Sequence, residues 1–331
     1  MGPAPTASEL TSSTAPEIAV GFIGLGRMGF PLAQNLVRSH VPVVAYNRTH
    51  AKVEPLVALG ARWAPTPKAV GRSVSKGVVF MIVTDGKAVQ KVLFGRGGVA
   101  QGAAPGTLVV DCSTIDPEES RTFAARLHER GIGYIDAPVG GSIDLAAQGK
   151  VTFFVGGDPA DVARVRPLLE RMGQKVEHMG PVGSGSSMKL VNNLLTLGIT
   201  VLSTEALSLA DAFHLSPTRV LEVLQAGGGR SAMLERKAGA FEARQYPPQF
   251  TTALARKDLR LIERAGTREK HPLRMVKEAR KLLDEAIAQG HSEEDFSSVL
   301  EATMTRGRPT ATKPTPSPTP GALPSAGNEG S

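Results

Sequence analysis

Residues 18–29 read IAVGFIGLGRMG, an apolar run that passes directly into a glycine-rich turn. Gly24, Gly26 and Gly29 form the pattern G-x-G-x-x-G between an expected strand and an expected helix. In this pattern the first glycine permits a tight turn, the second lets the backbone approach a pyrophosphate, and the third lets the helix pack against the sheet. The first amides of the helix would then face phosphate groups. The stretch therefore predicts the start of a dinucleotide-binding βαβ unit.

Further β-branched runs follow and alternate with amphipathic segments. They read VPVVAYN (41–47), GVVFMIV (77–83), TLVVDCS (107–113), GYIDAPV (133–139) and VTFFVGG (151–157). Several are apolar on both faces, as in parallel strands that are covered by helices on both sides. Helical spacing is present in Met28–Arg38, Ala88–Phe94 and Glu118–Arg130. The pattern predicts an α/β fold, with a doubly wound, Rossmann-type parallel sheet over residues 18–181.

The pattern changes after Gly185, because long helical segments replace the β-rich runs as far as about Met304. An all-α domain is therefore expected over residues 182–305. Its first helical pattern, Ser187–His214, is longer than most globular helices and is expected to join the domains and pack against a partner subunit. An isolated copy would expose a large apolar patch, so we expect a homodimer or homotetramer.

Both ends of the chain are expected to be disordered. Residues 1–17 lack the basic and apolar regions of a secretory signal, and residues 306–331 are rich in Pro, Ser and Thr. We expect no run of membrane-spanning length, because the best candidate, Leu190–Leu209, is interrupted by polar residues such as Asn192 and Glu205. These features predict a cytoplasmic protein without a membrane partner.

Composition limits the remaining classes of function. The single cysteine, Cys112, excludes an intramolecular disulfide and fits a reducing compartment. The histidines form no pair at ligand spacing near a second cysteine or a carboxylate cluster, so no metal is expected. The formal net charge is +7, but the basic residues are dispersed and aromatic residues are too few for a base-stacking surface. No nucleic-acid partner is expected, and the charge suits an anionic cofactor and substrate.

The end of the second expected strand indicates the type of cofactor. An NAD-binding protein usually places Asp or Glu there to hold the ribose 2′-hydroxyl. This chain has Asn47, Arg48 and Thr49 instead. No carboxylate would repel a 2′-phosphate, and Arg48 can supply a charge-assisted pair of hydrogen bonds. NADP is therefore favoured, with a solvated loop arginine as the alternative.

Residues 180–195, GPVGSGSSMKLVNNLL, open the long helix and supply a candidate for proton transfer. Lys189 and Asn193 are four residues apart and therefore share a helix face. The other faces are strongly apolar, and the preceding Gly/Ser turn permits a close approach. An amine at a dry domain junction can pass a proton to a carbonyl oxygen that is under hydride attack. Asn193 can orient a carboxylate or hydroxyl; an ordinary solvated lysine is the alternative.

With these motifs the chain resembles the β-hydroxyacid dehydrogenases, which include 3-hydroxyisobutyrate dehydrogenase, tartronate semialdehyde reductase and, more distantly, 6-phosphogluconate dehydrogenase. The resemblance runs in order from about Ile18 to Met304. It rests on GFIGLGRMGFPLAQNL (21–36) for the cofactor, DCSTIDPEES (111–120) and DAPVGGSIDLAAQG (136–149) for the substrate loops, MKLVNN (188–193) for the catalytic helix and FTTALARKDLRL (250–261) for the segment that closes the site.

The resemblance implies a role for each matching residue. Lys189 would be the catalytic acid/base, assisted by Asn193. The expected cofactor contacts are Gly24, Leu25, Gly26, Arg27, Met28, Gly29, Asn47, Arg48, Thr49, Val83, Thr84, Thr114 and Lys257. The expected substrate contacts are Ser113, Gly140, Gly141, Ser142, Lys189, Asn193, Phe250 and Asp258.

The resemblance also implies a reaction. NADPH would give hydride to an aldehyde or ketone carbon near a carboxylate, while protonated Lys189 gives a proton to the oxygen. Backbone amides around Gly141 would hold the carboxylate in an anion nest. Residues 47–49, 246–248 and 295–302 look closest to the NADPH-using glyoxylate/succinic semialdehyde reductases. We therefore expect an NADP-dependent oxidoreductase that interconverts a small β-hydroxy acid, or a related hydroxy acid, and its aldehyde or keto form.

Two positions depart from the family pattern. Many members have serine where this chain has Gly140, which removes one donor to the carboxylate unless Ser142 compensates. Glu263 replaces a small apolar residue after the KDLRL run, and it is expected on a solvated face rather than at the site. Both departures put the identity of the substrate in doubt, and not the type of reaction.

Two alternative functions remain open. An imine reductase would share the architecture, but such enzymes usually carry Asp or Tyr at the position of Lys189. A non-catalytic NADP-binding protein that serves in dimerisation or partner binding would be expected to lose the lysine. The proline-rich tail could bind an SH3-like partner, although a solubilising role is the favoured interpretation.

Overall fold

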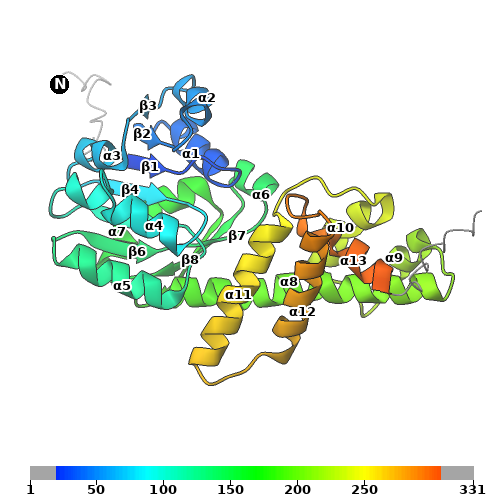
Figure 1. The fold of residues 1–331 in the computed structure, drawn as a ribbon. Helices are drawn as coiled ribbons and strands as arrows, with labels where there is room; N and C mark the ends of the chain where they lie inside the picture. Colours follow the sequence, from blue (N-terminus) through cyan, green and yellow to red (C-terminus); the bar gives the residue numbers. More distant parts are fainter. Residues whose placement is uncertain (1–19, 307–331) are drawn as a thin grey trace, which may run out of the picture.

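The computed structural model describes residues 20–306, and Figure 1 shows a sheet domain followed by a helical domain. The sheet has nine strands in the order β3-β2-β1-β4-β5-β6-β8-β7, and β9 pairs with β8. The strands are β1 Val20–Ile23, β2 Val43–Tyr46, β3 Arg62–Trp63, β4 Val78–Met81, β5 Leu108–Asp111, β6 Gly133–Asp136, β7 Val139–Gly140, β8 Thr152–Gly156 and β9 Lys175–Gly180. The α-helices of this domain are α1 Gly29–Arg38, α2 Glu54–Val57, α3 Pro67–Ser73, α4 Gly86–Phe94, α5 Pro117–His128, α6 Ile143–Ala147 and α7 Pro159–Met172, with short 3-10 helices at His50–Lys52 and Val99–Gln101.

The sheet is mostly parallel, which confirms the predicted fold class. Strands β1 to β6 all pair in parallel. The run 151–157 was expected to join them as another parallel strand, but β8 is antiparallel to β6 and β7. After β7 the chain crosses only the five-residue helix α6 before it returns as β8. The connection folds back beside β7, so β8 returns in the opposite direction.

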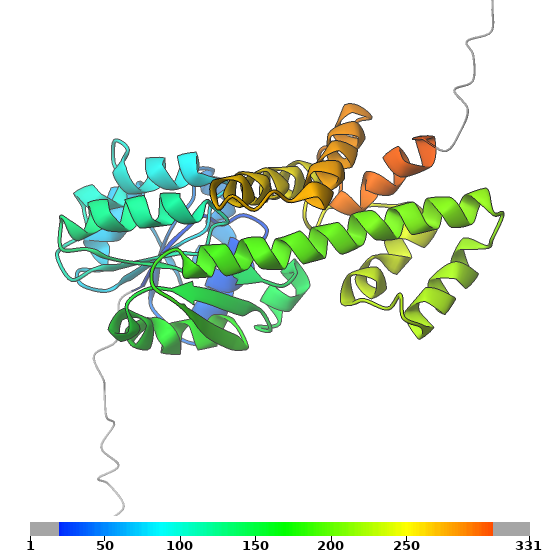
Figure 2. The same ribbon diagram turned by 90° about the horizontal axis from the view of Figure 1, so that it is seen from below.

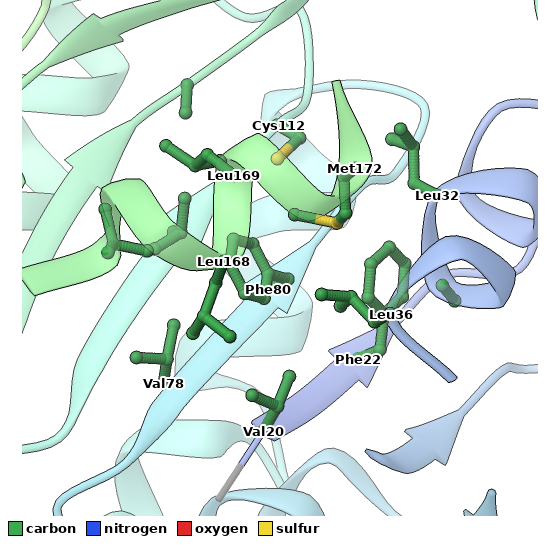
Figure 3. Packing of buried hydrophobic residues seen from close by; sticks show 14 of the residues in the cluster. Val20, Phe22, Leu32, Leu36, Val78, Phe80, Cys112, Leu168, Leu169 and Met172 are labelled. Carbon is green, nitrogen blue, oxygen red and sulfur yellow. The ribbon is translucent and has the colours of Figure 1, made fainter. Parts of the chain in front are cut away.

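Helices cover both faces of the sheet, as the two-sided apolar strands predicted. On one face Phe22 and Phe80 stack with ring centroids 6.2 Å apart. They pack beneath Leu36 of α1 and Leu169 of α7, as Figure 3 shows. On the other face α3, α4 and α5 supply a second buried cluster. Burial on both faces stabilises the strands. Because β1, β4 and β5 pair in parallel, their carboxyl ends lie side by side at the same end of the sheet.

The helical domain is built around one long rod. Its helices are α8 Ser184–Ala212, α9 Pro217–Ala226, α10 Ala232–Ala243, α11 Thr252–Arg268, α12 Arg274–Ala288 and α13 Val299–Arg306, with a 3-10 helix at Phe296–Ser298. In Figure 2, α8 runs from beneath the sheet to the far end of the molecule, with α9 and α10 on one side and α11 to α13 on the other. The first turn of α8 is fixed by Asp136 at the end of β6, whose carboxylate accepts the amides of Gly183 at 2.8 Å and Ser186 at 2.6 Å.

The long helix requires one correction of the sequence analysis. Within residues 20–306, α8 is the one helix long and apolar enough, by length and composition, to cross a membrane. The expectation that no run reaches that length is therefore wrong. One such helix is weak evidence for a membrane, because the core helix of a soluble protein passes the same test. In this fold α8 packs on β8, α10, α11, α12 and α13.

The predicted disordered ends lie almost wholly outside the described residues. The predicted N-terminal segment 1–17 is outside them, as is the tail from residue 307 onwards. Arg306, which was expected to begin the tail, is instead the last residue of α13.

Candidate active site

A cavity of about 760 Å³ lies between the two domains, at the carboxyl ends of the central strands. We call it the interdomain cavity. The sheet domain contributes the glycine-rich turn, the residues after β4 and β5, and the β7–α6 turn. The helical domain contributes one side each of α8 and α10, the start of α11 and the segment before it. Ligands of doubly wound sheets bind in this position.

The glycine-rich turn has the shape that a dinucleotide requires. Gly24 has φ +98°, and a Cβ there would lie 2.1 Å from the carbonyl oxygen of Ile82. A Cβ at Gly29 would lie 2.0 Å from the carbonyl oxygen of Gly24, so the start of α1 can pack only on bare backbone. Gly26 lines the interdomain cavity and has nothing within 4 Å of a Cβ position. The bare backbone at Gly26 is a cradle that a pyrophosphate can approach, and the residues present fit the expected cofactor.

The segment after β2 lies behind this turn. The Asn47 side chain accepts the Leu25 amide at 3.0 Å and donates to the Thr49 carbonyl at 2.9 Å. It therefore connects the glycine-rich turn to the segment after β2. Arg48 and Thr49 are exposed, and Arg48 forms no ion pair within the described part of the chain. Asn47, Arg48, Thr49, Gly24 and Leu25 do not line the interdomain cavity, whereas Gly26, Arg27, Met28 and Gly29 do.

Lys189 and Asn193 lie on the face of α8 that lines the cavity, as their spacing predicted. The Lys189 ammonium donates to the Val139 carbonyl at 2.7 Å. Loss of hydration lowers the pKa of Lys189 from 10.5 to about 8, with Asp258 opposing the shift and Lys257 adding to it. The Asn193 amide donates to Asp258 Oδ2 at 2.7 Å. Lys189 is therefore an amine that can hold or release a proton near neutral pH.

The start of α11 connects the two domains at the cavity. The Lys257 ammonium donates to the carbonyls of Thr84 and Thr114, both at 2.9 Å, and lies 3.0 Å from Asp258 Oδ1. That ion pair lacks hydrogen-bond geometry, so the buried Oδ1 accepts no hydrogen bond from the described residues. Buried acceptors are normally satisfied. Asp258 Oδ1 is therefore held by the charge of Lys257 and not by a hydrogen bond.

The loop after β5 is fixed by a buried carboxylate. Asp111 accepts the Ser113 amide at 2.9 Å and the Tyr134 hydroxyl at 3.0 Å. Burial raises the pKa of Asp111 to about 6, against the lowering effect of these hydrogen bonds. The Ser113 hydroxyl accepts the Val83 amide at 2.9 Å, and its interaction with the Asp111 carboxylate lowers the pKa of that group. Ser113 and Thr114 line the cavity, as do Val83 and Thr84.

The β7–α6 turn differs partly from the expectation. Gly141 and Ser142 line the cavity, but Gly140 does not. A Cβ at Gly140 would lie 2.8 Å from the ring of Phe154 on the neighbouring strand, so a serine at this position would require that ring to shift. The Ser142 hydroxyl accepts the Leu145 amide at 3.3 Å and so caps α6. It can compensate for the missing serine only by donating its hydrogen.

The second departure, Glu263, is remote from the chemistry. It does not line the interdomain cavity, and its carboxylate pairs with Arg280 of α12 at 2.9 Å. Arg280 in turn pairs with Asp284 at 2.7 Å. Glu263 therefore belongs to an ion-pair network between α11 and α12.

The cavity also contains residues that sequence reasoning missed. Phe250 and Asp258 line it as expected, but the wall opposite the sheet comes from α10, with Met233, Arg236 and Lys237. No motif marks α10, and its buried ion pair joins Lys237 to a residue 58 positions away in sequence. Within residues 20–306 no three His, Cys, Asp or Glu side chains gather in a group that could hold a metal ion.

Two domains of known type account for this arrangement. Residues 19–180 match the NAD-binding domain of 6-phosphogluconate dehydrogenase. Residues 183–303 match the NAD-binding domain of NADP-dependent 3-hydroxyisobutyrate dehydrogenase. Together with the fold and the lysine at the cavity, these matches define the class as an NAD(P)-dependent dehydrogenase or reductase.

Individual proteins support the same assignment. The chain is 35% identical to 2-(hydroxymethyl)glutarate dehydrogenase of Eubacterium barkeri, over 86% of this chain and 94% of that protein. It is 32% identical to the chloroplastic glyoxylate/succinic semialdehyde reductase 2 of Arabidopsis thaliana, over 88% and 82%. The crystal structure of a 3-hydroxyisobutyrate dehydrogenase from Salmonella typhimurium superposes with a TM-score of 0.78 at 27% identity, over 86% and 99%. The chain belongs to the β-hydroxyacid dehydrogenase family.

Imine reductases share this fold but are more distant in structure and sequence. An imine reductase from Myxococcus stipitatus has a TM-score of 0.61 and 19% identity, which is a likeness of fold alone.

Proposed function

We propose that this chain is an NADP-dependent oxidoreductase that interconverts a small β-hydroxy acid, or a related hydroxy acid, and its aldehyde or keto form, with Lys189 as the general acid/base. The observation that supports this most strongly is the position of Lys189. Its ammonium lies at the interdomain cavity beside the expected carboxylate loop, with its pKa lowered to about 8. Asn193 lies on the same helix face, and its hydrogen bond to Asp258 fixes its amide group. Lys189 and Asn193 therefore present a fixed pair of side chains to a substrate.

The chain would divide the reaction between its two domains. The nicotinamide supplies or accepts hydride when it is bound. In the reductive direction the Lys189 ammonium gives its proton to the carbonyl oxygen, and in the oxidative direction the neutral amine takes it back. The backbone amides of Gly141 and Ser142 would hold the substrate carboxylate next to Ser113, while Asn193 orients the reacting oxygen.

The test of this function is turnover with a panel of small substrates. Oxidation of NADPH would be followed with glyoxylate, succinic semialdehyde, tartronate semialdehyde and methylmalonate semialdehyde. We expect at least one of them to be reduced. If neither these substrates nor dicarboxylic analogues of them are reduced with NADPH or NADH although the cofactor binds, the proposed function is wrong, and a different carbonyl or imine substrate or a binding role takes its place.

The choice of NADP over NAD rests on Arg48, which is exposed and unpaired behind the glycine-rich turn. Its guanidinium can bind a 2′-phosphate through two hydrogen bonds. We expect Arg48→Ala to raise the KM for NADPH about tenfold or more, given about 1.5–3 kcal/mol for a hydrogen bond to a charged group. The KM for NADH should change little. Equal turnover with both cofactors in the natural protein, or an unchanged KM for NADPH in the variant, would contradict the preference.

We further propose that α8 forms a subunit interface. Its solvent side carries an apolar stripe with heptad-like spacing, formed by Val191, Leu195, Leu202 and Leu209, each more than half exposed. Gly198 interrupts the stripe where nothing lies within 4 Å of a Cβ, which permits close approach of a second helix. We expect a dimer or larger assembly by size-exclusion chromatography with light scattering, and a shift towards monomer in Leu202→Lys. A natural protein that is monomeric at micromolar concentration would exclude the interface.

A further inference from the structure

The interdomain cavity carries a surplus of positive charge. Five positively charged residues line it, and two negatively charged ones do. The cations are Arg27, Lys189, Arg236, Lys237 and Lys257, and the anions are Asp258 and Glu293. One substrate carboxylate and the cofactor phosphates would use part of this charge. A further anionic group of a ligand would bind a cation that has no partner within the protein.

Four of the five already have strong partners. Arg27 donates to the Pro248 carbonyl at 2.8 Å, and Lys189 donates to the Val139 carbonyl at 2.7 Å. Lys237 pairs with a buried carboxylate at 2.8 Å, and Lys257 pairs with Asp258 at 3.0 Å. Arg236 differs, because its one polar contact within the described residues is with the Met233 sulfur at 3.9 Å. Neither Glu293 nor any other described carboxylate lies within ion-pair distance of it.

Arg236 lies on the face of α10 that lines the cavity. Ala232, Met233, Arg236 and Lys237 all line the cavity, so a single face of α10 forms this wall. The Lys237 side chain, 7% exposed, anchors that face through its ion pair with Asp295. Helix α10 belongs to the helical domain, whereas Ser113, Gly141 and Ser142 belong to the sheet domain. Arg236 and the expected carboxylate loop therefore lie on different walls of one cavity of about 760 Å³.

We propose that Arg236 binds a second carboxylate of the substrate, at the end opposite the reacting hydroxyl, so that this enzyme prefers dicarboxylic β-hydroxy acids. This inference rests on the proposed function. A guanidinium presents paired N–H groups that match a carboxylate in a bidentate geometry. The carboxylate next to the reacting carbon would use the β7–α6 turn, and the distal one would use α10. Arg236 is exposed, so its guanidinium is accessible to such a carboxylate.

The experiment compares matched substrates in the oxidative direction with NADP⁺. Each 2-(hydroxymethyl) dicarboxylic acid, with one, two or three methylenes before the second carboxylate, is paired with the isostere that carries a methyl group in its place. In the natural protein we expect kcat/KM for at least one dicarboxylate to exceed that of its isostere by about tenfold to a hundredfold, as for a hydrogen-bonded charged group. In Arg236→Gln this ratio should fall towards one, mainly through KM. Arg236→Lys should retain only part of it, because the paired N–H geometry is lost.

The control variant is Arg260→Gln, which removes another exposed arginine that does not line the interdomain cavity; it should keep the ratio of the natural protein. If monocarboxylic hydroxy acids are oxidised and no dicarboxylate exceeds its isostere, the inference is wrong while the proposed function stands. The inference is also wrong if Arg236→Gln lowers both members of every pair equally or raises the KM for NADP⁺ instead. If no hydroxy acid of either kind is oxidised with NADP⁺ or NAD⁺, the proposed function is wrong and the inference falls with it.

Discussion

Replacement of Lys189 by alanine should lower kcat by about a hundredfold to ten-thousandfold in both directions, the range for loss of a general acid/base. The effect should be in kcat because Lys189 would transfer the proton to or from the reacting oxygen, a step that substrate binding does not require. Binding of NADPH, measured by fluorescence, should persist, since Lys189 lies apart from the glycine-rich turn in sequence and domain. The control is Lys150→Ala, an exposed lysine outside the cavity, which should keep full activity.

The pH profile distinguishes this role from a purely structural one. Burial disfavours the ammonium and lowers the pKa of Lys189 to about 8. Reduction needs the protonated form, so its rate should fall as pH rises through about 8, whereas oxidation needs the neutral amine and should rise over the same interval. The residual activity of Lys189→Ala should lack this change of rate near pH 8, which we call the pH limb. If the variant keeps the pH limb, or retains more than about a tenth of kcat, another group transfers the proton.

Much of the fold could be predicted because the glycine-rich motif and the apolar pattern of the strands indicate the same architecture. The glycine-rich turn requires a strand before it and a helix after it, and two-sided apolar strands require helices on both faces. The antiparallel return of β8 could not be predicted in this way, because its apolar run suits either direction. Strands β3 and β9 were also missed, since β3 has only two residues and β9 exposes most of its side chains.

The candidate site was predictable where local spacing determines it and not where tertiary contacts do. Lys189 and Asn193 share a face because they are four residues apart on one helix. By contrast, the occupation of the space at Gly140 by Phe154 depends on strand pairing, which the local sequence does not specify. The contribution of α10 to the cavity depends on how the other helices of this domain pack on α8. Its residues Arg236 and Lys237 therefore carried no recognisable signal.

The buried ion pair between Lys237 and Asp295 should matter most for stability. The side chains are 7% and 3% exposed and lie 2.8 Å apart, and the ammonium also lies 5.0 Å from the centre of the Phe296 ring. Lys237→Met should lower the free energy of unfolding by about 3–5 kcal/mol, because it leaves the Asp295 carboxylate buried without its counter-charge. Urea unfolding would measure this loss. The control Lys277→Met, at an exposed lysine of α12, should change stability by less than about 0.5 kcal/mol.

A double variant separates the cost of an unpaired charge from a general loss of packing. Lys237→Met combined with Asp295→Asn removes both charges, so it should be more stable than Lys237→Met alone. If the double variant is as unstable as the sum of the single ones, the two charges do not act as a pair. Asp295 also accepts the Phe250 amide at 3.1 Å and the Ser297 hydroxyl at 2.7 Å. Since Phe250 lines the interdomain cavity, the double variant should regain stability without full substrate affinity, because an asparagine holds the Phe250 segment less firmly than a carboxylate does.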